Sequence, residues 1–313
     1  MFGWTPLQRN AAIASFSSWT LDAFDFFVLV FLLSDIAQSF HVGLEQVTLA
    51  ILLTLAVRPI GALIFGRAAE KYGRKPILML PFIYYCVQES PVWLAARERK
   101  ESSALLPVLK SHWKLCCYLV LLMAAFNFFS HGTQDLYPVF LKVQHGFDPK
   151  TVSIIAISYN IASIIGGVFF GSLSEKIGRK KAIIIAALLA LPVIPLWAFS
   201  SGSLMLGIGA FLMQFMVQGA WGVVPTYLTE LVPANTRAVL PGFVYQLGNL
   251  IASVNATLQA TIAEHHGHNY GLAMAIVAGT VAVAIALLVF FGKDTRGKAI
   301  TDAVKNPGVR ANV

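Results

Sequence analysis

Residues 66–75 read GRAAEKYGRK, and residues 171–180 repeat the pattern as GSLSEKIGRK. Both copies have glycine at the first and eighth positions, glutamate at the fifth, and basic residues at the sixth, ninth and tenth. The glycines permit tight turns, the glutamate can accept hydrogen bonds from the start of the next helix, and the final basic pair is expected to stay in water. Two copies, each between apolar runs, predict a duplicated helical bundle. The residues expected to form these loops are Gly66, Glu70, Gly73, Arg74, Gly171, Glu175, Gly178 and Arg179.

Apolar runs long enough to cross ~30 Å of hydrocarbon lie on both sides of the two loops. Of the 313 residues, 57% are hydrophobic and 12% are charged, whereas an ordinary soluble domain has about 25% charged residues. This composition excludes a water-soluble enzyme and a nucleic-acid-binding protein, and it predicts an all-α membrane protein. One further run, residues 77–87, reaches only about 16 Å as a helix and predicts a short stub at one membrane face. The eight full spans are expected at roughly Ala11–Leu33, Thr48–Gly66, Leu115–Asp135, Thr151–Gly171, Ala182–Phe199, Leu204–Tyr227, Val239–Ile262 and Tyr270–Phe291.

The positions of the basic residues predict the orientation of these spans. With a cytoplasmic N-terminus, 20 of the 23 Lys and Arg residues fall in cytoplasmic segments, and only Lys142 and Lys150 fall in outer loops. Arg58 lies within a span. Because short cytoplasmic loops carry an excess of Lys and Arg, both termini are predicted to be cytoplasmic.

Two further stretches narrow the interpretation. The first span contains LDAFDFF at residues 21–27, and the third contains NFFSHGTQDLYP at residues 127–138. Together with the repeated loop, they resemble the major facilitator superfamily, in the branch of fungal lactate/pyruvate–proton symporters and bacterial sialic-acid–proton symporters. Glu70 and Glu175 stand where that family more often has Asp, and Val139 departs from a frequent Thr. The resemblance covers about residues 1–80 and 88–295, and it implies proton-coupled carboxylate transport in a plasma membrane, here a bacterial inner membrane.

Family members have twelve spans in two bundles of six, so this chain is expected to lack part of its N-terminal bundle. The stub at residues 77–87 is followed by QESPVWL at residues 88–94, which looks like the loop after the sixth helix. About four helices are therefore predicted to be absent, and an even number leaves the orientation of the others unchanged. The expected organisation is a truncated bundle at 1–87, a cytoplasmic loop at 88–114, a six-helix bundle at 115–292 and a cytoplasmic tail at 293–313.

Three charged residues are expected inside the membrane. Asp22 and Asp25 lie about 16 and 21 Å from the cytoplasmic start of their span, and Arg58 about 12 Å deep. An unpaired charge at such depth costs about 2.5–3.5 kcal/mol or more, so Asp22 and Arg58 are predicted to pair. In one interpretation Arg58 binds a substrate carboxylate and an aspartate takes up a proton. In the other, the charges form a structural ion pair between two helices.

The third span carries a row of polar residues. Asn127, His131 and Asp135 recur at every fourth position, with Ser130 and Gln134 on the neighbouring row, so all five share one stripe of the helix that is expected to face a water-filled cavity. An imidazole titrates near pH 6.5. His131 and Asp135 are therefore predicted to form a proton relay, with Asn127 and Ser130 contacting substrate. The alternative is a satisfied polar network without a transport role.

Other polar side chains lie at interior depths of the C-terminal spans. Gln246 and Asn249 are one turn apart, in a stretch that also resembles the symporters, and are predicted to contact substrate. Any one of these side chains can instead merely bond a neighbouring helix. Three histidines of an outer loop, His265, His266 and His268, are expected to be only polar. No metal site and no cofactor is predicted.

The sequence therefore predicts a secondary transporter, not an enzyme, that carries a small monocarboxylate such as lactate or pyruvate together with a proton. Its expected partners are the lipid bilayer, the organic anion and the proton, with no nucleic acid. Two alternatives remain open: a symporter of sialic acid or another organic acid, and a truncated membrane protein that does not transport.

Overall fold

The computed structural model describes residues 28–72, 111–232 and 240–293. All regular structure in these ranges is helical, which confirms the predicted all-α class. The calls on Asp22, Asp25, Gly73, Arg74 and the stub at residues 77–87 lie outside the described residues.

The described helices follow the order of the predicted spans. Six of them are long and apolar enough to cross a membrane, and a shorter apolar helix, Val28–Phe40, precedes α2. The labelled helices are α2 (Leu44–Tyr72), α7 (Trp113–Gln134), α8 (Tyr137–Val139), α9 (Pro149–Ile177), α10 (Arg179–Ala190), α11 (Ile194–Phe199), α12 (Ser203–Leu231), α13 (Leu240–Ala252), α14 (Asn255–His265) and α15 (Tyr270–Phe291).

One predicted span is divided, and the helix of another continues past a break at its predicted end. A turn at Ser253 and Val254 divides the span expected at 239–262 into α13 and α14. The helix that starts with α7 continues through α8 into a π-helical turn at Phe140–Gln144, after a break near Asp135 and Leu136. Both interruptions fall within apolar stretches, where freed backbone groups need partners from neighbouring helices.

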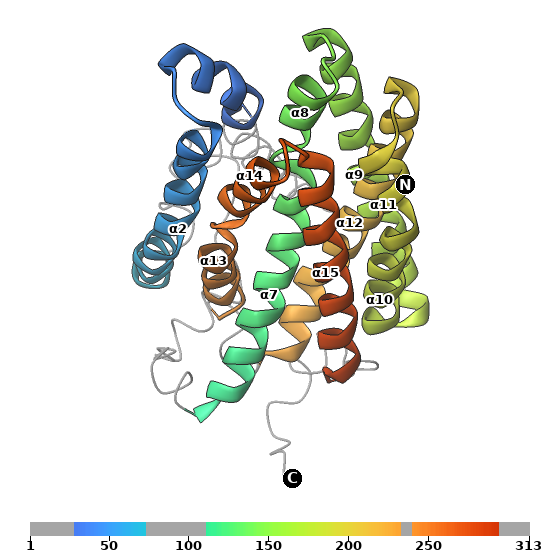
Figure 1. Cartoon of the computed structure of the whole chain (residues 1–313). Helices are drawn as coiled ribbons and strands as arrows, with labels where there is room; N and C mark the ends of the chain where they lie inside the picture. The colour runs from blue at the N-terminus through green and yellow to red at the C-terminus, as the bar shows by residue number, and fades with distance from the viewer. Residues whose placement is uncertain (1–27, 73–110, 233–239, 294–313) are drawn as a thin grey trace, which may run out of the picture.

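Helix α7 runs through the middle of the bundle (Figure 1). It packs against α13 and α15, while α9 and α12 form the most extensive helix pair. Glycines bring α9 and α12 together, since a Cβ atom added to Gly222 would lie 2.6 Å from the carbonyl oxygen of Gly167. An added Cβ at Gly166 would likewise collide with the carbonyl of Phe215. Small residues of this kind allow backbones to approach closely where lipid supplies no hydrophobic driving force.

On the other side of the bundle, α2 packs against α13 and α14 (Figure 1). The hydroxyls of Thr48 on α2 and Thr257 on α14 lie 3.2 Å apart. Lys142, beyond α8, contacts the carboxylate of Asp35 at 3.3 Å and also donates to the carbonyl of Phe31. These contacts connect the N-terminal helices to the bundle formed by residues 111–293.

The repeated loop differs from its prediction in three respects. Gly66 and Gly171 lie inside α2 and α9, because both helices continue for six residues beyond them. Gly178 makes the turn of the second loop, with a φ of 95° that favours glycine. Glu175 is exposed and does not cap α10, which begins without a side-chain cap among the described residues.

The basic pair of the second loop also does not stay in water. Arg179 donates to the hydroxyl of Ser174 at 2.6 Å and to Glu230 of α12 at 3.3 Å. Lys180 donates to the carbonyls of Phe290 and Gly292 at the end of α15. The expectation of a solvated pair was wrong because carbonyl groups at helix ends and a buried carboxylate compete with water for these donors.

Candidate functional site

His131 and Asp135 form a close pair on α7, as their spacing predicts. The Nδ1 atom of His131 lies 3.2 Å from each carboxylate oxygen of Asp135, and the contact with Oδ1 has hydrogen-bond geometry. The side chain of Asp135 is only 1% exposed, whereas that of His131 is 17% exposed. The histidine is therefore the more accessible member of a pair whose carboxylate is enclosed by the protein.

Asp135 retains capacity to bind a proton or a donor group. Its Oδ2 atom is buried and has no hydrogen-bond partner among the described residues, and the same holds for the hydroxyl of Tyr159 on α9. Tyr159 lies near Asp135. An ionised carboxylate can only accept hydrogen bonds, and burial without partners is costly, so protonation or a ligand donor at Oδ2 would relieve that cost.

Two residues of the polar row on α7, Ser130 and Gln134, bond to α12. Gln134 donates to the side-chain oxygen of Gln214 at 3.0 Å, and Gln218 donates to the hydroxyl of Ser130 at 3.0 Å. Gln214 also donates to the hydroxyl of Thr133 at 3.0 Å. Ser130 and Gln134 of the predicted polar row are thus engaged between α7 and α12.

Asn127 and the predicted pair on α13 meet at the contact between α7 and α13. Asn127 is buried and donates to the backbone carbonyl of Tyr245 at 3.4 Å. Asn249 donates to Gln246 at 3.1 Å, which confirms that these two side chains share one helix face. Asn249 is fully buried, and its Oδ1 atom has no partner among the described residues. The structure therefore brings three of the predicted substrate contacts to one region.

Arg58 lies at the centre of α2 and is half-buried. Its predicted partner Asp22 falls outside the described residues, so the pairing stays a prediction. Since α2 packs against α13 and α14, Arg58 belongs to the helix that faces the same part of the bundle as Gln246 and Asn249.

Two buried amides of α14 were missed from the sequence. Gln259 donates to the carbonyl of Gly132 on α7 at 2.9 Å and to Asn255 at 3.4 Å. Gly132 makes this possible, because a Cβ atom there would lie 3.2 Å from Gln259 Nε2. The Nδ2 atom of Asn255 and the Oε1 atom of Gln259 remain without partners among the described residues. Their spacing of four residues within an apolar run was the available signal.

Asp148 and His145, which lie outside the spans, have shifted pKa values. Hydrogen bonds from Thr151, first from its hydroxyl and then from its backbone, lower the pKa of Asp148 at the start of α9. Burial lowers the pKa of His145 in the adjoining loop. Among the described residues, no three His, Cys, Asp or Glu side chains are grouped so that they could hold a metal ion.

Comparison with known proteins agrees with this architecture. The chain is 34% identical over 197 residues to a protein of Saccharomyces cerevisiae named carboxylic acid transporter protein homolog. The match covers 59% of this chain but only 32% of the yeast protein, so the chain spans about a third of that relative's length. It is 22% identical over 394 residues to the sialic acid transporter NanX of Escherichia coli, with 94% of this chain and 96% of the relative covered. It is 21% identical over 228 residues to the cis,cis-muconate transport protein of Acinetobacter baylyi, with 70% of this chain and 55% of the relative covered.

These relatives are named as transporters, in agreement with the prediction that the chain is not an enzyme. The family model described as Major Facilitator Superfamily matches residues 117–311, which is more than half of the chain. This multi-pass membrane protein therefore belongs to the major facilitator superfamily.

Proposed function

We propose that the chain is a secondary transporter that carries a small monocarboxylate, such as lactate or pyruvate, together with a proton across a bacterial plasma membrane. The observation that carries this proposal is the pair of His131 and Asp135, in which one buried carboxylate oxygen accepts no hydrogen bond among the described residues. A titratable pair inside a membrane span is costly and by default functional.

The proposed proton path uses the difference in exposure between the two side chains. His131, the more accessible, exchanges the proton with water, and Asp135 holds it at the unpartnered oxygen. Protonation neutralises Asp135 and removes a charge that would otherwise repel a carboxylate substrate. Asp22 and Asp25 are proposed to assist proton uptake from the first span.

The proposed substrate contacts combine a charge with amide and hydroxyl groups. Arg58 binds the carboxylate of the substrate through its planar guanidinium. The remaining contacts are proposed for Asn127, Ser130, Gln246 and Asn249. The two sets of helices then rock about this central site, as in transporters built from repeated bundles.

Sialic acid, a larger acid, is the second candidate substrate. The similarity to NanX extends over 94% of the chain, further than the similarity to the yeast relative. Competition between the two acids for uptake distinguishes them, since a site that fits the smaller molecule excludes the larger one.

A third possibility is that the chain folds but does not transport. The alignment with NanX covers 394 residues whereas the chain has 313, so segments of the relative have no counterpart here. This supports the prediction that about four helices are absent after the stub at residues 77–87. Rocking between two states needs two bundles. Because the N-terminal bundle is predicted to lack helices, the chain can be one that functions only beside another subunit.

Uptake of radiolabelled lactate by proteoliposomes tests the proposal. We expect uptake that follows an inward proton gradient and stops with an uncoupler. Arg58→Ala and Asp135→Asn should reduce uptake at least about tenfold, the effect of a single strong charged contact. Asp148→Asn is the matched control, because Asp148 is exposed and outside the spans.

The outcomes separate the three functions. Uptake no higher than that of empty vesicles, by protein that unfolds cooperatively on heating, would establish the non-transporting chain. Inhibition of lactate uptake by sialic acid at comparable concentration would favour the larger substrate. Sequencing the gene across the codons for residues 78–88 establishes whether the organism's gene itself lacks the helices that are predicted to be absent there.

A further inference from the structure

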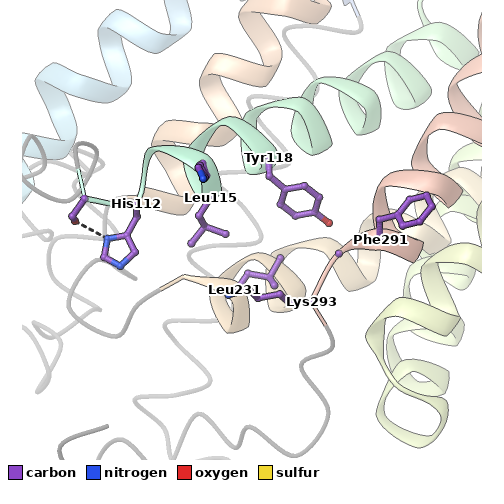
Figure 2. Close-up of a pocket in the computed structure, with 9 residues that line it drawn as sticks. His112, Leu115, Tyr118, Leu231, Phe291 and Lys293 are labelled. Atoms are coloured by element: carbon purple, nitrogen blue, oxygen red, sulfur yellow. Dashed lines mark hydrogen bonds between the residues drawn. The ribbon is translucent and has the colours of Figure 1, made fainter. Parts of the chain in front are cut away.

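A pocket of about 400 Å³ opens at the end of the bundle opposite the outer contacts of Lys142. The start of α7 and the ends of α12 and α15 form its walls (Figure 2). Tyr118, Leu231 and Phe291 line it together with His112, Lys114 and Lys293. By the distribution of basic residues, this end of the bundle is the predicted cytoplasmic one.

The charge of the pocket is basic. Lys114 and Lys293 both contribute to its lining, His112 stands beside them, and no acidic side chain is among the lining residues that the structure describes. Lys114 also lies 5.9 Å above the ring centroid of Trp113, a distance at which the ring attracts the cation. The pocket therefore favours an anion.

The end of α15 would ordinarily oppose that preference, because its free carbonyls carry partial negative charge. Here those carbonyls already have donors. Tyr118 donates to the carbonyl of Leu288 at 3.0 Å, and Tyr227 donates to that of Lys293 at 3.1 Å. Lys180 donates to the carbonyls of Phe290 and Gly292. These donors offset part of the negative charge at the end of α15 where it reaches the pocket.

The remaining walls are apolar and lie at the edge of the membrane span. Leu115 and Leu231 line the pocket, and Phe291, the last residue of its span, is 80% exposed. Trp113, the first residue of the span that contains α7, is 58% exposed. Aromatic residues gather at the level of the lipid headgroups. A ligand here meets positive charge on one side and apolar surface on the other.

We propose that this pocket binds the headgroup of an anionic phospholipid of the adjacent leaflet, with the acyl chains against Phe291 and Leu115. A free anion such as phosphate would use the lysines but leave the apolar walls without a partner. Anionic lipids are concentrated in the cytoplasmic leaflet and attract basic groups near its surface. This site does not depend on the proposed transport, and its test needs no uptake measurement.

Native mass spectrometry of the full-length chain released from detergent tests the proposal. Phosphatidylglycerol and phosphatidylcholine with identical acyl chains are titrated, and we expect the protein to retain phosphatidylglycerol at least about tenfold more tightly. The double variant Lys114→Gln/Lys293→Gln should lose this preference. Lys114→Arg/Lys293→Arg, which keeps both charges, should retain it.

The matched control is Lys176→Gln/Lys181→Gln, which removes the same charge at the same end of the bundle. Lys176 and Lys181 are exposed and do not line the pocket, so this variant should bind like the unmodified protein. Thermal unfolding in a neutral detergent verifies that each variant is folded.

Several results would overturn the proposal. They are an absence of preference for phosphatidylglycerol in the unmodified protein, an equal loss in both glutamine variants, and a preference that survives in Lys114→Gln/Lys293→Gln. Displacement of the bound lipid by inorganic phosphate at millimolar concentration would instead identify a free-anion site.

Discussion

Arg179 illustrates how one side chain positions a loop. It connects the turn at Gly178 to α12 through its contacts with Ser174 and Glu230. Glu230 is 8% exposed, and its Oε2 atom has no partner among the described residues. Without Arg179 the buried carboxylate would lose its neutralising charge. We therefore expect Arg179→Gln to lower the free energy of unfolding by about 1–3 kcal/mol, less than a fully buried pair because Arg179 is partly exposed.

Thermal unfolding of the detergent-solubilised protein measures this effect. Lys176→Gln is the control, because Lys176 is exposed on the preceding helical turn and the substitution removes the same charge. Equal losses of stability in the two variants would show that the contact with Glu230 contributes nothing specific.

Single residues differ in how far the sequence predicts their contacts. The pairing of His131 with Asp135 follows from a spacing of four residues on one helix, and the structure shows it. Arg179 meets a residue 51 positions away, which no local pattern indicates. The sequence identified Arg179 as part of a loop motif but placed it in water, since the packing of α10 against α12 brings Glu230 beside it.

At the level of elements, the contact of α13 with α7 depends on a residue without a side chain. A Cβ atom at Gly248 would lie 2.6 Å from Met123 Cβ and 2.8 Å from the backbone nitrogen of Ala124. Gly248→Ala should therefore separate the helices and lower stability by about 1–3 kcal/mol. Gly242→Ala on the same helix is the control, because no atom of the described residues lies within 4 Å of the added Cβ, and helix propensity predicts no loss.

Thermal unfolding of both variants is the measurement. A melting temperature for Gly248→Ala that equals or exceeds that of Gly242→Ala would show that α7 and α13 adjust freely at this contact.

The start of α9 provides a prediction of pH dependence. Asp148 accepts hydrogen bonds from the hydroxyl of Thr151 at 2.6 Å and from the backbone nitrogens of Lys150 and Thr151. These bonds lower the pKa of Asp148 from its ordinary value of 3.8. A lowered pKa in the folded state stabilises the protein above the unfolded pKa, and this contribution is lost as the pH falls through the folded value.

We therefore expect Thr151→Val to raise the pKa of Asp148 toward its unfolded value, so that the contribution of Asp148 to stability near neutral pH becomes smaller. The melting temperature should be lower than that of the unmodified protein at pH 7, and it should fall less between pH 7 and pH 3. Ser153→Ala is the control, because Ser153 bonds only to the carbonyl of Pro149 in its own helix. Identical pH profiles for the two variants would contradict the role of Thr151.

The elements were predictable where hydropathy alone determines them. The spans near α7, α12 and α15 correspond to the apolar runs, whereas α9 continues from Gly171 to Ile177 through polar residues that hydropathy does not recognise as helix. The break between α13 and α14 falls at Ser253 and Val254, without a proline or glycine that would indicate it. Gln259 of α14 instead bonds to α7, and no local sequence pattern indicates this contact.

For the whole molecule, the contacts of the N-terminal helices suggest that they are less firmly held than the rest. The pair of Lys142 and Asp35 is partly in solvent, with Asp35 59% and Lys142 19% exposed, and ion pairs that water reaches contribute about 0–1 kcal/mol. We expect backbone amides of residues 28–72 to exchange hydrogen faster than those of α9 and α12, as measured by mass spectrometry in nanodiscs. Local opening of weakly packed regions explains such a difference.

Lys142→Gln should accelerate exchange in Val28–Phe40, because it removes the bonds to Phe31 and Asp35. Lys150→Gln removes a charge from the same predicted outer side without removing those bonds, so it should leave exchange unchanged. Uniform protection across residues 28–72 and α12 would show that the N-terminal helices and the bundle open as one unit.

The direct backbone contact between α9 and α12 has a practical consequence for observing this protein in motion. At Gly166 and Gly222 the backbones of the two helices meet directly, and at Gly219 the ring of Phe170 packs against the glycine, so the two helices have little room to slide past each other. Two spin labels, one on the lipid-facing surface of each helix, should therefore keep a constant separation in every state. Measured beside a second pair of labels on α2 and α9, they provide an internal reference against which displacement of the N-terminal helices becomes visible.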